Sequence, residues 1–240
     1  MNQRQVIVNA DDFGQSPGIN RGVIEAFERG IVTSASLMVR WGAAAEAAGY
    51  ARCHPEMSVG LHLDFGEMTW RDEEWVSLYR VVDENDARSV SSEIERQVDL
   101  FGQLMGRRPT HIDSHQHVHV REPARTSVLR VADFLAVPVR NLTPSIRYCG
   151  CFYGQDDKGR PYPQNISVSG LQALLSELEP GVTELGCHPA AAVDLETMYG
   201  AERIAELQTL CDSRARQALT VNGVELRSFA DWGTLAVSNA

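Results

Sequence analysis

The chain has no surplus of basic residues and no long apolar run, and both absences limit its function. Its 32 acidic residues outnumber 22 lysines and arginines, which gives a formal net charge of −10. A negative chain without a basic stripe repels a phosphate backbone, so nucleic acid is not an expected partner. Because no stretch of 18 apolar residues is present, we expect no membrane-spanning helix. Residues 1–5 lead directly into a predicted strand and do not resemble a signal peptide, so we expect a cytoplasmic location.

Cysteine is also scarce, and its five copies lack the spacing of a disulfide framework or a zinc knuckle. Cys149 and Cys151 are separated only by Gly150, which leaves too little chain for a persuasive structural disulfide. Cys187 is expected to pack as a small apolar residue. A nucleophilic dyad of Cys187 and His188 is the alternative, but adjacent residues of a strand point to opposite faces and do not readily share a hydrogen bond.

Linkers, internal repeats and low-complexity segments are absent as well, and this favours one folded unit. A chain of 240 residues can bury roughly three quarters of the surface that it exposes when unfolded, which is enough for a substantial core. We therefore interpret residues 1–240 as a single catalytic domain.

The predicted elements alternate between short β-branched segments and amphipathic helices. Strands are predicted at residues 5–9, 34–39, 58–64, 110–113, 137–141, 182–187 and 219–226. Helical periodicity separates them, as in Ile19, Val23 and Phe27, which recur every four residues before Gly30. Such alternation predicts a mainly parallel sheet with its functional loops at one end. The expected fold is α/β, a distorted or incomplete (β/α) barrel with mainly parallel strands, and a doubly wound sheet is the alternative.

Histidine is concentrated in one segment. The run Thr110-His111-Ile112-Asp113-Ser114-His115-Gln116-His117-Val118-His119 contains four of the seven histidines. It is predicted as a short strand, His111 to Asp113, followed by a loop, which is where α/β folds carry their chemistry. Alternate residues of an extended chain share a face, so His115, His117 and His119 are expected to point the same way. The density of histidines favours a metal site over an exposed polar loop.

Two adjacent carboxylates follow the first predicted strand. Asn9-Ala10-Asp11-Asp12-Phe13-Gly14 comes directly after the β-branched run Val6-Ile7-Val8. Neighbouring carboxylates repel one another unless a cation or a proton is shared, and a divalent metal supplies that cation. Asp12 as a helix cap is the structural alternative, but Ser16 followed by Pro17 is the better start for the next helix. The aspartate pair is therefore interpreted as part of a ligand-binding site.

Two further histidines lie at predicted strand ends. Residues 58–65 alternate between apolar and polar, which places His62 and Asp64 on one face. His188 follows a strand that Pro189 cannot continue. Either histidine alone is more typical of a half-buried, hydrogen-bonded side chain than of a ligand. Together with the clusters above they place titratable or metal-binding groups at four strand ends, which indicates an active site.

Two long segments, residues 65–86 and 142–164, are predicted to be irregular. Insertions of about twenty residues in a compact domain are commonly lids or binding loops. Both are rich in aromatic residues, namely Trp70, Trp75, Tyr79, Tyr148, Phe152, Tyr153 and Tyr162. Exposed rings suit the apolar faces of sugars, although anchoring the loops or closing a dimer interface is an equally good interpretation.

The clusters resemble the signature blocks of one family, the YdjC-like carbohydrate deacetylases, which include chitooligosaccharide deacetylases. The blocks are, in the order of the family, Asn9-Ala10-Asp11-Asp12-Phe13-Gly14, Gly60-Leu61-His62-Leu63, the histidine-rich run 110–119 and Cys187-His188-Pro189. The first and third blocks are specific, whereas the other two mean little alone. Because the blocks span residues 9–189, the resemblance covers most of the chain.

The resemblance implies roles for five residues. Asp12, His62 and His115 match the divalent-metal triad of the family. Asp11 matches the carboxylate that acts as base on the water beside the metal. His188 matches the histidine proposed as proton donor.

Three other polar residues near these blocks lie outside that set. His117 and His119 belong to the third block but not to the triad, so supporting or substrate-binding roles fit them better. Asp64 departs from the apolar or hydroxyl residue expected at its position. This departure concerns the choice of sugar and not the metal site.

Hydrolysis of an amide suits such a set of residues. A carboxylate and two imidazoles leave open positions on one divalent ion, which acts as a Lewis acid and generates the nucleophile. Zn²⁺ fits these ligands, and Mg²⁺ or Mn²⁺ remains open. The expected reaction removes an acetyl group from N-acetylated sugars, with short N-acetylglucosamine oligosaccharides as substrates and a homodimer as the expected assembly. The alternatives are a metal-dependent hydrolase of another amide or ester bond, and a non-catalytic metal-binding or sugar-binding protein.

Overall fold

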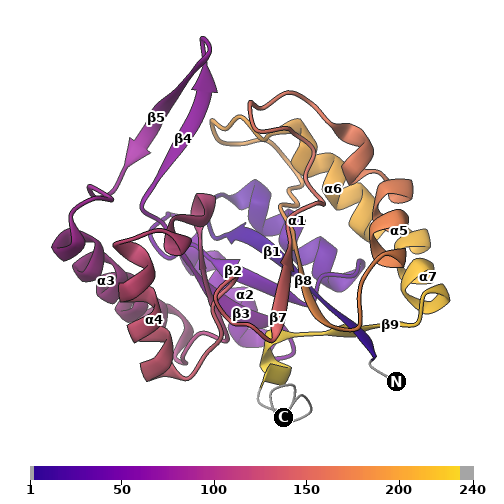
Figure 1. The fold of residues 1–240 in the computed structure, drawn as a ribbon, viewed down its shortest axis with the longest axis horizontal. Coiled ribbons are helices and arrows are strands. Elements are labelled where there is room, and N and C mark those ends of the chain that lie inside the picture. Colours follow the sequence, from indigo (N-terminus) through magenta and orange to yellow (C-terminus); the bar gives the residue numbers. More distant parts are fainter. Residues whose placement is uncertain (1–2, 233–240) are drawn as a thin grey trace.

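The centre of the molecule is a curled parallel sheet, which a computed structural model describes for residues 3–232 (Figure 1). Among these residues, six strands follow the order β6-β3-β2-β1-β8-β7, and a seventh, β9, also pairs with β1. Every pairing in this sheet is parallel. The expected incomplete (β/α) barrel with mainly parallel strands is therefore confirmed. The bounds are β1 (Arg4–Phe13), β2 (Ser34–Leu37), β3 (Ser58–Leu63), β6 (Ile112–Ser114), β7 (Ile146–Cys149), β8 (Gly181–Cys187) and β9 (Val224–Arg227).

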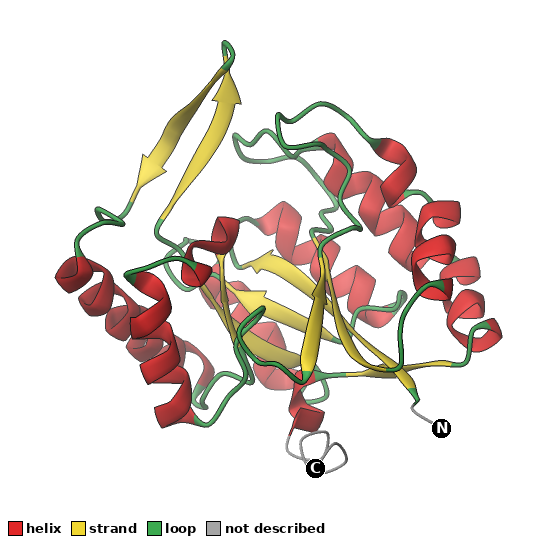
Figure 2. Ribbon diagram, in the orientation of Figure 1, coloured by secondary structure: helices red, strands yellow, loops and turns green. Residues whose placement is uncertain are grey.

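Helices flank the sheet, with α3 and α4 on one side and α5, α6 and α7 on the other (Figure 2). The first helix begins as the sequence predicts, because the Ser16 hydroxyl accepts a hydrogen bond from the backbone N–H of Ile19 and Pro17 occupies the first turn. Their bounds are α1 (Pro17–Glu28), α2 (Ala44–Cys53), α3 (Ala87–Met105), α4 (Ala124–Leu135), α5 (Val168–Ser176), α6 (Ala201–Cys211) and α7 (Ser213–Val221).

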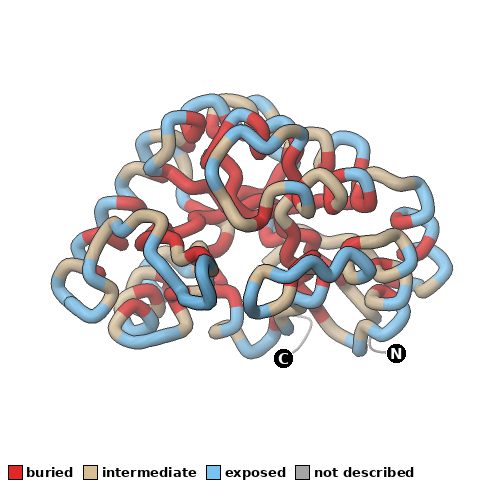
Figure 3. The backbone as a smooth tube through the Cα atoms, turned by 90° about the horizontal axis from the view of Figure 1, so that it is seen from above, coloured by how far each residue is buried: buried red, intermediate tan, exposed pale blue. Residues whose placement is uncertain are grey.

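The core lies between the sheet and these helices, and Figure 3 shows buried backbone in the centre with exposed segments around it. β1 is buried over its last eight residues, as expected for a central strand covered on both faces. Cys187 at the end of β8 is fully buried and packs as the small apolar residue that the sequence predicts. Within the described residues all five cysteines are free thiols. No helix of residues 3–232 is both long and apolar enough to cross a bilayer.

Two predicted strands differ from the structure. Residues 137–141 contribute only an isolated parallel bridge between Val139 and Ile112, because the backbone turns into the left-handed region at Ala136 (φ 55°) and at Asn141 (φ 61°). The predicted strand 219–226 begins too early, since Leu219 belongs to α7 and β9 starts at Val224. The sequence does carry a sign of the second turn, because Asn222 and Gly223, with φ of 60° at Gly223, end α7 just before β9.

The segment 65–86 is not irregular as predicted, because most of it forms an antiparallel hairpin of β4 (Gly66–Arg71) and β5 (Glu74–Arg80). Its two turn residues, Asp72 and Glu73, have positive φ values of 51° and 68°, the geometry that glycine or asparagine usually signals in hairpins. Trp70 and Trp75 face each other across the strands, with ring centroids 5.5 Å apart. The hairpin projects above the sheet, opposite the loops that precede α5 and α6 (Figure 1).

Candidate active site and metal centre

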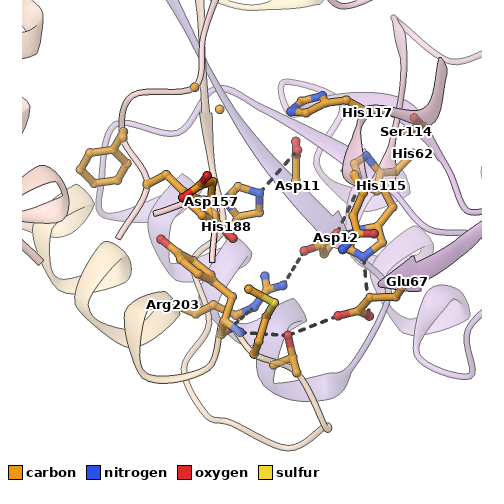
Figure 4. A pocket seen from close by; sticks show the side chains of 18 of the residues that line it. Asp11, Asp12, His62, Glu67, Ser114, His115, His117, Asp157, His188 and Arg203 are labelled. Carbon is orange, nitrogen blue, oxygen red and sulfur yellow. Dashed lines mark hydrogen bonds and ion pairs between the residues drawn. The ribbon is translucent and has the colours of Figure 1, made fainter. Parts of the chain in front are cut away.

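A pocket of about 470 Å³ opens at the carboxyl ends of β1, β3, β6 and β8, within the usual size range of small-molecule sites. One wall is the hairpin, through Glu67 and Trp75, and the opposite wall is formed by residues 150–157 and 197–203. All five candidate site residues line it, as Figure 4 shows for Asp11, Asp12, His62, His115 and His188. Residues that are far apart in the sequence thus meet where parallel sheets bind ligands.

A bulge explains how two adjacent aspartates reach the same pocket. Neighbouring residues of a regular strand point to opposite faces, but the register of β1 against β2 shifts between Ala10 and Phe13. Asp12 lies at this shift with φ of 64°, in the left-handed region. Such a conformation costs on the order of 1–3 kcal/mol and is typical of functional sites. The bulge therefore turns Asp12 towards the pocket that Asp11 also lines.

Asp12, His62 and His115 form a group that could hold a metal ion. One potential ligand atom of each lies within 4.8 Å of the others. Asp12 Oδ1 accepts a hydrogen bond from His115 Nδ1 (3.1 Å) and lies 3.3 Å from His62 Nε2. His115 Nε2 is buried without a hydrogen-bond partner, and it lies 3.6 Å from Glu67 Oε2. One carboxylate and two imidazoles, one of them with this unsatisfied nitrogen, fit a divalent ion such as Zn²⁺.

The charges of this group are set by close pairing with neighbouring side chains. Burial alone would raise the pKa of Asp12, but Arg203 and His115 hold it well below its usual value. Burial would lower the pKa of His62, but Asp113 and Asp11 raise it to about 10. The pKa of His115 rises to about 9 against the effect of burial, chiefly through Asp12. A metal therefore competes with protons for both histidines at neutral pH.

The potential ligand atoms of a second group, Asp11, His62 and Asp113, also lie within 4.8 Å of one another. The guanidinium of Arg140 already contacts two of these residues. Arg140 is buried, and its guanidinium donates to Asp11 Oδ2 (2.6 Å) and to Glu184 Oε1 (2.7 Å) and lies 2.7 Å from Asp113 Oδ2. Burial would raise the pKa of Asp11, but Arg140 lowers it, so this carboxyl is ionised at neutral pH. Arg140 thus holds Asp11 charged and fixed in position beside the metal group.

His188 lies between two carboxylates. Its Nε2 is 3.8 Å from Asp11 Oδ2, and its Nδ1 is 3.8 Å from Glu206 Oε1. Glu206 also accepts a hydrogen bond from the backbone N–H of His188. The edges or faces of Tyr153 and Tyr199 pack against the imidazole, each with ring centroids 5.5 Å away. These contacts fix a titratable group within reach of both Asp11 and the open pocket.

The histidine-rich segment does not adopt the extended conformation predicted for it. After β6 it forms a short 3₁₀ segment, η1 (His115–Val120), in which Gln116 and His117 have φ values of 50° and 54°. His115 and His117 line the pocket, whereas His119 is buried behind it and its Nε2 lies 3.0 Å from the backbone oxygen of Arg140. The expectation that His115, His117 and His119 share one face is therefore wrong.

Asp64 is also placed differently from the expected shared face with His62. It lies just beyond β3, outside the pocket lining, and is fully buried. Its carboxylate accepts hydrogen bonds from Arg40 Nη1 and from the Tyr79 hydroxyl, both at 2.9 Å. Asp64 therefore anchors the base of the hairpin, which shapes one wall of the pocket.

Sequence reasoning missed several residues that support the site. Arg140 lies in a predicted strand, and no pattern marks a buried arginine. Arg203 and Glu206 are three residues apart on α6, so both face the site from one side of that helix. Their only sequence signal is that two charged residues fall on a helix face otherwise occupied by Leu207 and Leu210, both buried.

Comparison with known proteins identifies the family. The model of the YdjC-like protein family matches residues 5–221. The chain belongs to the YdjC-like family. A chitooligosaccharide deacetylase of Serratia marcescens is 33% identical, over 95% of this chain and 99% of the relative. A carbohydrate deacetylase of Geobacillus stearothermophilus is 31% identical, over 95% and 98%. The family expected from the signature blocks is thereby confirmed.

Solved structures share the fold of this YdjC-like chain. An Enterococcus faecalis V583 protein, provisionally named a cellobiose-phosphate cleavage protein, superposes with a TM-score of 0.75 at 26% identity, covering 96% of this chain and 99% of the other. A family 4 carbohydrate esterase from Streptomyces lividans in complex with acetate gives a TM-score of 0.54 at 14% identity, covering 94% and 93%. At that identity the second likeness shows the fold alone.

Proposed function

We propose that this YdjC-like protein is a metal-dependent deacetylase that removes an acetyl group from N-acetylated sugars, with short N-acetylglucosamine oligosaccharides as substrates. The observation that carries the proposal is the meeting of Asp11, Asp12, His62, His115 and His188 in one pocket. The names of the relatives, chitooligosaccharide deacetylase and carbohydrate deacetylase, support the same activity.

The residues divide into a metal-holding set and a proton-transfer set. Asp12, His62 and His115 would hold one divalent ion, Zn²⁺ or Mg²⁺, which when bound supplies a Lewis acid for the acyl oxygen and for water. Asp11 is fixed by Arg140 and by the Asn9 side-chain amide, which donates to Asp11 Oδ1 at 3.0 Å. An ionised carboxylate held in this way is ready to accept the proton of the attacking water.

His188 has the complementary task in this mechanism. The sugar amine is a poor leaving group until its nitrogen is protonated, and the imidazole of His188 is the proton donor proposed for that step. Its Nε2 lies 3.8 Å from Asp11 Oδ2, so the two groups flank the space where the amide would lie. Glu206 holds the backbone of His188 by accepting its N–H, and Glu206 Oε1 lies 3.8 Å from Nδ1. The products are acetate and a free amine, with the glycosidic bond intact.

Aromatic side chains provide surfaces for a sugar. Trp75 on the hairpin is 46% exposed and lines the pocket, and Tyr148 and Tyr153 line the opposite side. Flat apolar rings of this kind pack against the apolar faces of pyranose rings. We further propose that one catalytic domain, residues 1–240, carries the whole activity, and that it acts as a homodimer in the cytoplasm.

The competing function is hydrolysis of another amide or an ester bond by the same residues. A non-catalytic sugar-binding or metal-binding role would leave the pairing of Asp11 with Arg140, beside His188, without a purpose. The test is incubation of the full chain, loaded with Zn²⁺ or Mg²⁺, with N,N′-diacetylchitobiose and with acetyl esters of sugars, followed by mass spectrometry of the products. Loss of one acetyl group from the amide substrate supports the proposal. Cleavage of esters alone, or no reaction by a folded and metal-loaded protein, refutes it.

A further inference from the structure

Arg203 on α6 makes a close ion pair with a proposed metal ligand. Its Nη2 donates to Asp12 Oδ2 at 2.6 Å, and its Nε donates to the backbone oxygen of Tyr199 at 2.9 Å. The side chain is almost completely buried yet borders the pocket. Figure 4 shows the guanidinium reaching Asp12 from the side opposite His62 and His115.

The two oxygens of Asp12 are therefore divided between two sets of partners. Oδ1 faces His62 Nε2 (3.3 Å) and His115 Nδ1 (3.1 Å), which are the other members of the group that could hold a metal. Oδ2 is occupied by Arg203. A carboxylate held in this way offers one oxygen, and not two, to an ion bound among the three residues.

Arg203 is the cation that contacts Oδ2, whereas the other basic side chains of the site have different partners. His62 and His115 face Oδ1. Arg140, the other guanidinium at the site, is engaged by Asp11, Asp113 and Glu184. Arg203 Nη1 is buried without a hydrogen-bond partner, so the guanidinium sits at Asp12 although this position leaves one of its own donors unsatisfied.

We propose that Arg203 is a positioning residue that holds Asp12 Oδ2 and so limits Asp12 to one oxygen for the metal. The inference rests on the proposed metal-holding role of Asp12. It has an uncommon consequence, because an arginine and a divalent ion that share one carboxylate repel each other. Arg203 therefore orients Asp12 and at the same time weakens metal binding.

A purely structural role for Arg203 predicts the opposite effect on affinity. If it only held α6 against the sheet, its loss would loosen the site and weaken both the fold and the metal. If it restrains Asp12, its loss frees Oδ2 and removes a charge that repels the metal, and the metal then binds more tightly. The direction of the change in metal affinity separates the two roles.

The test compares Arg203→Met, which keeps much of the volume but removes the charge, with Arg203→Lys, which keeps the charge. Arg216→Met is the matched control, because Arg216 lies on the neighbouring helix α7 and donates only to a backbone oxygen, that of Gly30. Thermal unfolding of the full chain is followed with a chelator and with saturating Zn²⁺. Affinity for Zn²⁺ is measured by competition with a chromophoric chelator, so no readout depends on turnover.

For Arg203→Met we expect a Zn²⁺ affinity about fivefold or more tighter than that of wild type. Saturating Zn²⁺ should then raise the unfolding midpoint of this variant by at least as much as it raises that of wild type. Arg203→Lys and Arg216→Met should keep an affinity close to wild type. If Arg203→Met does not fold without metal, Arg203→Gln, which keeps a donor but not the charge, is measured with the same expectations.

Weaker or unchanged Zn²⁺ binding by the uncharged variant overturns the inference while leaving the proposed function intact. A folded wild-type protein that binds neither Zn²⁺ nor Mg²⁺ overturns the proposed metal site itself. The two failures are therefore distinguishable.

Discussion

Changing Asp11 to asparagine should separate proton transfer from folding and from metal binding. Asparagine keeps the shape of the side chain and can still accept a hydrogen bond from Arg140, but it cannot take a proton from water. In the structure Asp11 accepts from both Nη1 and Nη2 of Arg140 at 2.6 Å. The substitution removes one carboxylate of the three that surround this guanidinium, because Asp113 and Glu184 remain within 2.7 Å.

The cost to stability should be small for a buried ion pair. Removing one partner of such a pair typically costs about 3–5 kcal/mol because it leaves an uncompensated charge. Here Arg140 keeps two carboxylates, and the site already carries more negative charge than one guanidinium balances. Burial, with repulsion from Asp113 and Asp11, raises the pKa of Glu184 to about 7 despite Arg140. We therefore expect Asp11→Asn to destabilise the protein by no more than about 1–2 kcal/mol.

The effect on turnover should be much larger. A positioned general base contributes roughly 10²–10⁴ to the rate, which corresponds to about 2.7–5.4 kcal/mol of activation free energy at 1.36 kcal/mol for each factor of ten. The assay is acetate release from N,N′-diacetylchitobiose under saturating conditions, with metal content and thermal unfolding measured on the same preparation. Asp133→Asn, an exposed change on α4, is the matched control and should behave as wild type.

The reasoning fails if Asp11→Asn is folded, metal-loaded and nearly as active as wild type. Asp11 would then have no part in proton transfer. Loss of metal together with activity would instead assign Asp11 to the metal, and its pairing with Arg140 would have been misinterpreted.

Three further predictions follow from contacts in and around the site. His62→Ala and His115→Ala should each lower Zn²⁺ affinity by at least about tenfold, and full metal occupancy in both variants, measured by elemental analysis, would contradict their assignment. Gly60→Ala should destabilise the protein by about 1–3 kcal/mol or prevent folding, since a Cβ at residue 60 would lie 2.4 Å from Cε1 of His111. Denaturant unfolding measures the change, and a midpoint equal to that of wild type would show that the imidazole ring of His111 can move. Stability should fall as pH is lowered from about 6.5 towards 4. In the folded protein burial lowers the pKa of His111, His117 and His119 to about 4, so only the unfolded chain takes up protons at these positions in that pH range. Urea unfolding at several pH values measures the effect, and a flat profile would be inconsistent with buried neutral histidines.

Much of the fold was predictable because its strands and helices have clear periodicities and caps. The strand before Asp11 is a run of β-branched residues, and the helix after it starts at Ser16 and Pro17, as the structure has it. The hairpin was not predictable in the same way. Its turn consists of Asp72 and Glu73 at positive φ, and neither residue is a strong signal for such a turn.

The pocket-lining candidates were found because each lies near the end of a strand or directly after one, in a recognisable block. The residues that hold these candidates in place could not be found from sequence blocks, because their partners lie far away in the sequence. Arg140 is 129 positions from Asp11, and Arg203 is 191 positions from Asp12. A single charged residue in a predicted strand or on a helix carries no local mark of such a contact, so these roles become visible only in three dimensions.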